Sequence, residues 1–272
     1  MEQFDLLIIG SGPAGAAAAF KARSLGLGVC LVEKADIGGT CLNRGCIPTK
    51  VFLHGAKLLR DFREAERFGI DAGEPRFDFS RLSGWKDTVV QNLRKNQTAA
   101  LLKAGVRMEA GEARIEEPGC VSIGAGKYAG ARAILVAAGT APARLPVQGN
   151  DLDGVYSSDD FLDGNGVFAK GDLFTGGPAP GVPKRLTIIG GGVIGVEFAA
   201  AYSAFGSELT VIEALPSLLA SMDREIGQNL ALLLKKRGVR IMTGVRISAI
   251  EKTGGVLRTL FSAPPDGSGG AE

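Results

Sequence analysis

The sequence is poor in several residue types, and each scarcity excludes a class of protein. Its 272 residues hold one histidine (His54), one tryptophan (Trp85) and four cysteines. Four cysteines are too few for a small scaffold stapled by disulfides. The formal net charge is only +2, so the chain lacks the strong basic field typical of a dedicated nucleic-acid binder. We therefore expect no nucleic-acid partner.

Long apolar runs are also missing. The most apolar stretches are residues 6–20, which contain three glycines, and residues 186–206, which contain Glu197. Neither supplies the roughly 20 apolar residues that a membrane-spanning helix needs. The first five residues, MEQFD, carry no basic region of a secretory signal. The sequence thus predicts a cytoplasmic protein without a membrane partner.

Glycine, by contrast, is abundant. It accounts for 40 of the 272 residues, about twice its usual share of ~7%. The glycines follow no Gly-X-Y period, which excludes collagen, and they cluster at a few points of the chain. The length predicts about two domains.

The hydrophobic pattern predicts an α/β protein with two similar beginnings. Apolar runs at 4–9 and 27–33 enclose a glycine turn and an Ala-rich helix, which is the order of a βαβ unit. The same order returns at 186–213. Further helices are expected at 48–68, 78–104 and 223–237, short strands between 106 and 137 and at 239–242, and a hairpin at 247–261.

Composition also suggests where the domains end. Residues 163–184 are rich in glycine and proline, which is typical of a connector. We therefore predict a first domain at 1–155, a connector at 156–184 and a second domain at 185–272. The last residues, SAPPDGSGGAE, have the composition of a linker.

The first glycine cluster is Gly10-Ser11-Gly12-Pro13-Ala14-Gly15, between a predicted strand and a predicted helix. This is the context that a dinucleotide-binding fingerprint requires. The three glycines permit a tight turn, close approach to the pyrophosphate and close packing of helix on strand. Glu33 ends the next predicted strand, where a carboxylate can bind ribose hydroxyls. The alternative is a packing turn beside a surface glutamate.

The second cluster is Gly190-Gly191-Gly192-Val193-Ile194-Gly195, in the same context. Glu213 follows the first glycine at the same distance as Glu33 follows Gly10. A carboxylate at this position repels a 2′-phosphate, which favours NAD over NADP.

Two cysteines, Cys41 and Cys46, follow the first fingerprint with four residues between them. Pro48 suits the first turn of a helix, and a helix N-terminus or a nearby cation lowers the pKa of a thiol. Such a pair can be oxidised and reduced in place. The alternatives are two buried thiols or half of a metal site. A metal site would need further cysteine or histidine ligands, and the few that remain lead us to predict no metal.

The segment GGTCLNRGCIPTK, with GSGPAG before it and GGGVIGVEFA after it, resembles the flavoprotein disulfide reductases. This is the class I pyridine nucleotide-disulfide oxidoreductase family, and the resemblance is strongest to its dihydrolipoyl dehydrogenase branch. It covers nearly the whole chain. It implies two Rossmann-like FAD/NAD(P)-binding domains of the three-layer ββα type. It also implies oxidation of dihydrolipoamide, or of a lipoyl domain, through a Cys41–Cys46 disulfide and FAD, with hydride passed to NAD⁺.

The same resemblance assigns roles to single residues. Cys41 would exchange with the dithiol substrate and Cys46 would lie next to the flavin. Lys50 would lie near flavin N5 and pair with Glu197. The residues implied to bind FAD are Gly10, Gly12, Pro13, Ala14, Gly15, Glu33, Lys34, Gly39, Thr40, Lys50, Ala113, Ala138, Gly139 and Thr140. Those implied to bind NAD are Gly190, Gly192, Val193, Ile194, Gly195, Glu213 and Ile247.

The chain also departs from that family. Its members are usually much longer, and they end in a dimerisation domain that supplies a catalytic His-Glu pair to the partner subunit. His54 does not match that histidine, and Gly171-Asp172 does not match the family's second FAD contact. We therefore expect an N-terminal fragment of a homodimeric enzyme, with little turnover alone. The alternatives are a mercuric or glutathione reductase-like enzyme, both of which usually prefer NADPH, or a non-catalytic FAD/NAD-binding module.

Overall fold

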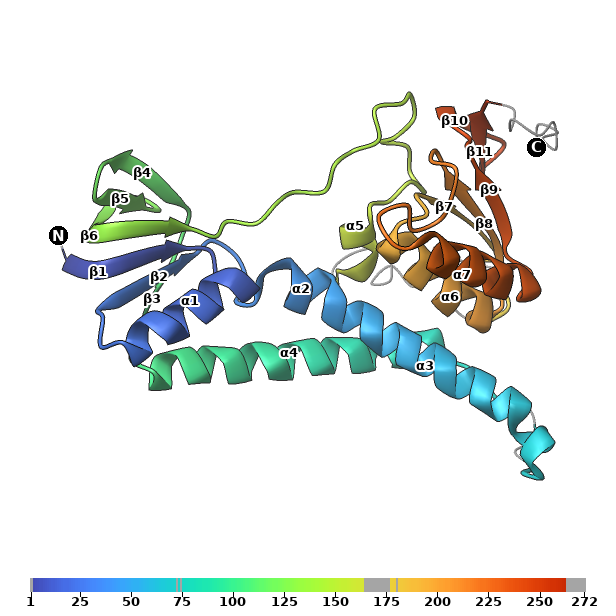
Figure 1. The fold of residues 1–272 in the computed structure, drawn as a ribbon, viewed down its shortest axis with the longest axis horizontal. Helices are drawn as coiled ribbons and strands as arrows, with labels where there is room; N and C mark the ends of the chain where they lie inside the picture. The colour runs from blue at the N-terminus through green and yellow to red at the C-terminus, as the bar shows by residue number, and fades with distance from the viewer. Residues whose placement is uncertain (1, 72, 74, 164–176, 180, 263–272) are drawn as a thin grey trace. The chain divides into compact units, whose positions relative to one another are not determined.

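The computed structural model describes residues 2–71, 73, 75–163, 177–179 and 181–262. The chain divides into two compact units (Figure 1). Unit 1 comprises Met1–Pro48 and Lys86–Ala141, and unit 2 comprises Thr49–Trp85 and Pro142–Glu272. Each unit is discontinuous in sequence because helix α3 (Cys46–Glu64) begins in unit 1 and ends in unit 2, and helix α4 (Phe79–Lys103) returns the chain.

Unit 1 is built on a six-stranded mixed sheet in the order β3-β2-β1-β6-β5-β4. Strand β1 pairs in parallel with β2 and β6, and β2 with β3, whereas β4, β5 and β6 form an antiparallel meander. Helix α1 (Pro13–Ser24) connects β1 to β2. The strands are β1 (Glu2–Ile9), β2 (Val29–Glu33), β3 (Arg107–Ala110), β4 (Ala113–Glu117), β5 (Cys120–Ile123) and β6 (Lys127–Val136).

The core of unit 1 lies on both faces of this sheet. Successive side chains of a strand point to opposite faces. Leu7 accordingly packs in a cluster with Val32 and Val121, while its neighbour Ile8 packs in another with Leu31 and Leu101. Leu101 is on α4, so this long helix closes one face of the sheet. Two-sided burial explains why β1 and β2 read as nearly continuous apolar runs.

Unit 2 contains a parallel sheet in the order β7-β8-β9 and a separate hairpin of β10 and β11. Its helices include α3, the first residues of α4, and the short 3₁₀ helix η1 (Ala65–Phe68). The strands are β7 (Arg185–Ile189), β8 (Glu208–Glu213), β9 (Arg240–Thr243), β10 (Ile247–Thr253) and β11 (Val256–Phe261). The other helices are α5 (Ser158–Leu162), α6 (Val193–Phe205) and α7 (Arg224–Lys236).

Aromatic rings dominate the core of unit 2. Tyr202 on α6 lies within ring contact of Phe79, Phe161, Phe198 and Phe205. These residues come from the beginning of α4, from α5 and from α6. The cluster therefore joins segments that are far apart in sequence into one hydrophobic core.

The structure confirms the predicted fold class, and it differs from the expected elements at several positions. Helix α3 begins at Cys46 instead of Pro48, and an additional short helix, α2 (Gly39–Arg44), precedes it. Proline is tolerated in the first turn of a helix because the amide it lacks has no partner there. Strand β6 is one continuous strand of ten residues, because its pairing with β5 at 127–130 overlaps its pairing with β1 at 129–136.

The predicted domain boundaries remain predictions. Much of the connector, at 164–176 and 180, lies outside the described residues, as do Gly171-Asp172 and all but the first residue of the linker-like C-terminal stretch. Within the part that the structure describes, no helix is both long and apolar enough to span a membrane.

Candidate functional site

The first fingerprint forms the turn between β1 and α1. Gly10 has a φ of +103°, which favours glycine. A Cβ on Gly15 would lie 1.9 Å from the Gly10 carbonyl oxygen, so only glycine lets the helix pack this closely on the turn. Gly12 is the N-cap of α1 and has no side chain to cap it. The amides and the positive dipole end of α1 thus remain available to an anion.

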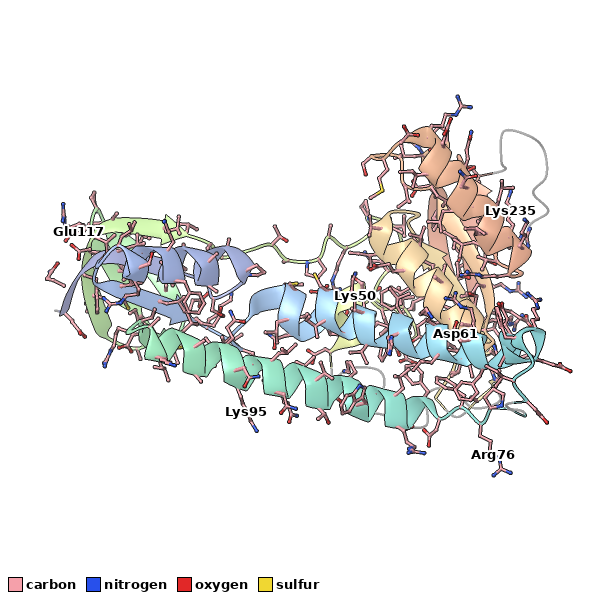
Figure 2. All side chains as sticks on the ribbon, turned by 60° about the horizontal axis from the view of Figure 1, so that its bottom comes forward. Lys50, Asp61, Arg76, Lys95, Glu117 and Lys235 are labelled. Carbon is pink, nitrogen blue, oxygen red and sulfur yellow. The ribbon has the colours of Figure 1, made fainter. Side chains whose placement is uncertain are left out.

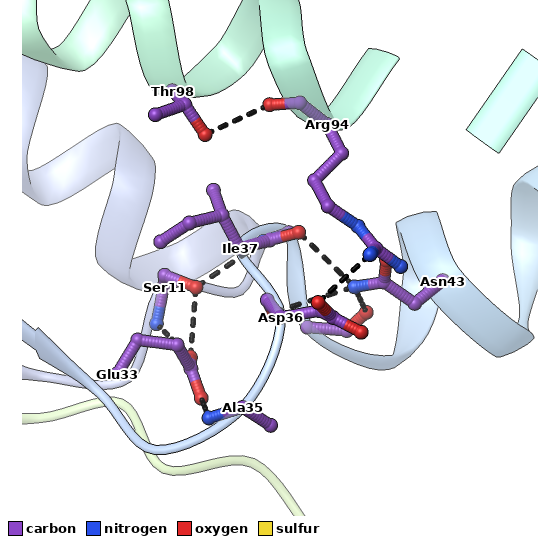
Figure 3. A network of polar contacts seen from close by, with 10 residues as sticks. Ser11, Glu33, Ala35, Asp36, Ile37, Asn43, Arg94 and Thr98 are labelled. Carbon is purple, nitrogen blue, oxygen red and sulfur yellow. Dashed lines mark hydrogen bonds and ion pairs between the residues drawn. The ribbon is translucent and has the colours of Figure 1, made fainter. Parts of the chain in front are cut away.

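Glu33, the last residue of β2, is fixed beside this turn. One carboxylate oxygen accepts hydrogen bonds from the Ser11 amide at 2.9 Å and the Ser11 hydroxyl at 2.7 Å, as Figure 3 shows. The other accepts from the Ala35 amide at 2.9 Å. Burial raises the pKa of Glu33, but these hydrogen bonds outweigh it and the net pKa is lowered. The carboxylate is therefore charged at neutral pH.

The end of β6 lies against the same turn. The Ala137 amide donates to the Ile9 carbonyl at 2.8 Å. A Cβ on Gly10 would approach the Ala137 carbonyl oxygen to 2.3 Å and the Ala138 Cα to 3.2 Å. The exposed residues Ala138, Gly139 and Thr140 follow directly, so the structure brings them beside the fingerprint.

The cysteine segment begins in contact with the fingerprint. A Cβ on Gly39, the first residue of α2, would lie 2.7 Å from the Gly12 Cα. Cys41 is half-buried in α2, and Cys46 is exposed at the beginning of α3. Between the two helices, a Cβ on Gly45 would lie 3.3 Å from the Cys41 Cα. Glycine thus lets the chain turn closely around the first cysteine.

The second fingerprint repeats the first within unit 2. Gly190 has a φ of +107°, and a Cβ on Gly195 would again lie 1.9 Å from the carbonyl oxygen of the first glycine. Glu213 accepts from the Gly191 amide at 2.6 Å and from the Leu215 amide at 2.7 Å. Around Gly192, apart from Gly192 itself and its two chain neighbours, no heavy atom of the described residues lies within 4 Å of the place a Cβ would occupy.

The two fingerprints differ at their second position. Ser11 donates its hydroxyl to Glu33. At the equivalent Gly191, a Cβ would lie 2.4 Å from the Leu218 side chain. The second fingerprint therefore holds its glutamate through backbone amides.

Lys50 and Glu197 form an ion pair within unit 2. The Lys50 ammonium donates to the Glu197 carboxylate at 2.7 Å, between α3 and α6. The side chain of Lys50, labelled in Figure 2, is 60% exposed, and that of Glu197 is 23% exposed. The structure thus brings together the two residues expected to pair.

The remaining predicted residues lie at the edges of the two fingerprints or in the packing nearby. The exposed Lys34 forms a long contact of 3.8 Å with Glu112, a kind of pair that contributes little. Ala113 begins β4 and packs on the core, and Ile247 begins β10 beside Ile212. The exposed positions are Pro13, Ala14, Thr40, Val193 and Ile194.

Sequence reasoning missed one group of polar residues. Arg94 on α4 contacts Asn43 on α2 and Asp36 in the loop before it (Figure 3). The signal in the sequence that could have identified this group is a charged residue at helical spacing between Val90 and Leu101. The structure buries both of these apolar residues of α4. As for metals, the structure shows no group of three His, Cys, Asp or Glu in its described part that could hold an ion.

Comparisons with known proteins find relatives of similar sequence and fold. The dihydrolipoyl dehydrogenase of Thermus scotoductus is 37% identical over 269 residues, covering 98% of this chain and 54% of that protein. The dihydrolipoyl dehydrogenase of Pseudomonas aeruginosa is 37% identical over 249 residues, covering 88% of this chain and 50% of that protein. The structure of the HOCl-induced flavoprotein disulfide reductase RclA from Escherichia coli matches with a TM-score of 0.76 at 29% identity, covering 94% of this chain and 52% of that one.

The chain thus spans about half the length of these relatives. Its α/β fold matches the FAD/NAD-binding region of flavoprotein disulfide reductases. The family model described as pyridine nucleotide-disulphide oxidoreductase matches residues 4–264. Proteins of that family typically bind FAD and NAD(P). With two fingerprints, a cysteine pair beside the first, and a match over nearly its whole length, the chain belongs to the pyridine nucleotide-disulphide oxidoreductase family.

Proposed function

We propose that this chain is the nucleotide- and thiol-bearing part of a dihydrolipoyl dehydrogenase. The enzyme would oxidise dihydrolipoamide, or the dithiol of a lipoyl domain, and reduce NAD⁺. The observation that carries the proposal is the contact between the cysteine segment and the first fingerprint, where Gly39 lies against Gly12. A module that only binds nucleotides has no need of a cysteine pair at this place.

The first fingerprint fits the ADP half of FAD. The open N-terminus of α1 would hold the pyrophosphate, and the charged Glu33 would accept hydrogen bonds from the ribose. The residues after β6, Ala138, Gly139 and Thr140, would lie beside it. When bound, FAD supplies the two-electron relay between thiols and nicotinamide. The family resemblance further assigns Lys50, with its partner Glu197, to the flavin.

The cysteines would perform thiol–disulfide exchange. One thiolate of dihydrolipoamide attacks the Cys41 sulfur, the Cys41–Cys46 bond breaks, and Cys46 leaves as a thiolate. The second substrate thiol then displaces Cys41 and closes the lipoamide ring. Two electrons pass to the protein, and the two protons of the substrate thiols balance the two thiolates formed.

The second fingerprint fits NAD. Both oxygens of Glu213 accept backbone hydrogen bonds, which hold the carboxylate where the ribose hydroxyls would bind. A 2′-phosphate would meet this negative charge, so we propose NAD rather than NADP. The same argument disfavours mercuric and glutathione reductase-like activities, which usually use NADPH. By family resemblance, we further propose a homodimer in the cytoplasm.

The test measures oxidation of dihydrolipoamide by the oxidised chain under anaerobic conditions, in amounts stoichiometric with protein. We expect one lipoamide per chain, and none from Cys41→Ser or Cys46→Ser. Cys120→Ser is the matched control, because Cys120 lies in β5. If the wild type oxidises no dithiol while it binds FAD and NADH, the non-catalytic module becomes the correct description.

A further inference from the structure

Arg94 joins α4 to the helix that carries Cys41. Its Nε and one terminal nitrogen donate to the Asn43 side-chain oxygen at 3.0 and 2.7 Å. The other terminal nitrogen donates to the Asp36 carboxylate at 2.7 Å (Figure 3). The planar guanidinium thus contacts one residue before α2 and one near its end, and a flexible lysine cannot reproduce that fork.

Asn43 connects Arg94 to the backbone that precedes Cys41. Its side-chain amide nitrogen lies 2.9 Å from the Gly39 carbonyl oxygen and 3.1 Å from the Ile37 carbonyl oxygen. Since the Asn43 oxygen accepts from Arg94, both ends of the amide are engaged. The position of α2 therefore depends on a chain of hydrogen bonds from Arg94 through Asn43 to the loop.

The placement of Arg94 on α4 is informative. Val90 and Leu101 on the same helix are almost fully buried. Between them, at helical spacing, are Arg94 and Gln97, and Gln97 reaches the Ser11 carbonyl at 3.5 Å. An apolar stripe would bury more hydrophobic surface. The two polar residues instead meet the cysteine segment and the fingerprint.

We propose that Arg94 is a positioning residue for the dithiol, acting through Asn43 on the helix that holds Cys41. This inference rests on the proposed function, in which Cys41 and Cys46 form a redox disulfide. A disulfide requires narrow limits of distance and torsion between its two residues. Fixing α2 raises the effective concentration of one thiol toward the other, and loosening it lowers that concentration.

The readout is the thiol–disulfide equilibrium of the pair with glutathione. Two glutathione thiols reduce the Cys41–Cys46 bond, glutathione disulfide forms, and the two thiol protons pass to the cysteines. The equilibrium constant gives the effective concentration of the pair. It is measured by acid quenching, alkylation and peptide mass mapping, so that Cys30 and Cys120 are counted separately.

We expect Arg94→Lys and Arg94→Met to lower the effective concentration about tenfold, the effect of losing roughly one charge-assisted hydrogen bond. Asp36→Asn is the first control, because it removes the exposed ion pair and leaves the Arg94–Asn43 contact. Lys95→Met is the second control, since the exposed Lys95 points away from the network (Figure 2). Both controls should remain within about twofold of the wild type.

The outcomes separate the two proposals. If the wild type forms the disulfide and Arg94→Lys keeps its effective concentration within about twofold, the positioning role is wrong and the proposed function stands. If the wild type forms no Cys41–Cys46 disulfide, the proposed function fails and the positioning role fails with it. Arg94→Lys is the decisive variant because it keeps the charge and the aliphatic stem. The thermal unfolding of Arg94→Lys is compared with that of Asp36→Asn. This comparison shows whether a lower effective concentration reflects general destabilisation.

Discussion

Two glycines of the second fingerprint have different surroundings, so we expect substitutions at them to have different effects. In the second fingerprint, a Cβ on Gly195 would overlap the Gly190 carbonyl oxygen, whereas one on Gly192 would meet open space in the described structure. Gly195 is thus needed for packing of α6 on its strand. Gly192 is instead available for the approach of a ligand. Under the proposed function, one motif therefore contains a folding requirement and a binding requirement at separate residues.

We expect Gly195→Ala to lower the free energy of unfolding by about 2 kcal/mol or more, because the helix must move away from the turn. Gly192→Ala should lower it by only about 0.5–1 kcal/mol, because Gly192 is the N-cap of α6 and alanine caps a helix less well than glycine. Urea unfolding followed by circular dichroism measures both. Equal losses would contradict the assignment of the two glycines to different roles.

The Glu33 carboxylate makes a pH-dependent contribution to stability. Its pKa is lowered in the folded state, so the contribution is present above the unfolded pKa near 4.5 and is lost as the pH falls through the lower folded value. Glu33→Gln removes this titration. We expect the variant to lose less stability than the wild type between about pH 5 and pH 3, as measured by urea unfolding at each pH. Parallel profiles would refute the prediction.

At the level of elements, the helix that follows each fingerprint is placed by two different forces. The glycine turn fixes its N-terminus, and hydrophobic packing fixes the rest. For α6 this packing comes from the aromatic cluster around Tyr202. That cluster also buries a polar atom that has no hydrogen bond among the described residues to offset its loss of water. Within the described part of the chain, the Tyr202 hydroxyl has no hydrogen-bond partner although it is fully buried.

Removing this hydroxyl should stabilise the protein. A buried polar group without a hydrogen bond costs about 1–3 kcal/mol, and burial also raises the pKa of Tyr202 well above its ordinary value. We expect Tyr202→Phe to raise the free energy of unfolding by about 1 kcal/mol. Tyr156→Phe is the control, because Tyr156 packs against the same cluster but is only partly buried. A lower stability for Tyr202→Phe would indicate a partner for its hydroxyl.

At the scale of the whole molecule, the chain contains two glycine fingerprints with the same design in separate units, each a proposed nucleotide site. The first belongs to the mixed sheet of unit 1, and the second to the parallel sheet of unit 2. Each has its own turn, helix and carboxylate. The two sites should therefore bind their ligands independently.

Single substitutions should separate the two binding events. We expect Gly12→Ala to weaken FAD binding about tenfold or more and leave NADH binding unchanged, because the added methyl group lies where the pyrophosphate approaches. Gly192→Ala should have the reverse effect. Titration calorimetry with each nucleotide measures both. A substitution that weakens both nucleotides equally would show that the sites are not independent.

The sequence by itself determined both glycine turns, the helices and strands around them, and the cysteine pair. Each of these depends on residues close together in the chain, where the spacing of glycines and apolar residues reflects backbone geometry directly. The carboxylates Glu33 and Glu213 were also identifiable, because each ends the second strand of its βαβ unit.

Only the tertiary structure decided which distant residues meet. Arg94 and Asn43 are 51 residues apart, and Arg63 donates to the Ala204 carbonyl across 141 residues. The division into two discontinuous units has the same origin, since α3 and α4 each carry residues of both. Local patterns contain no information on such pairs, because the contacts form only when the packed core fixes one helix against another.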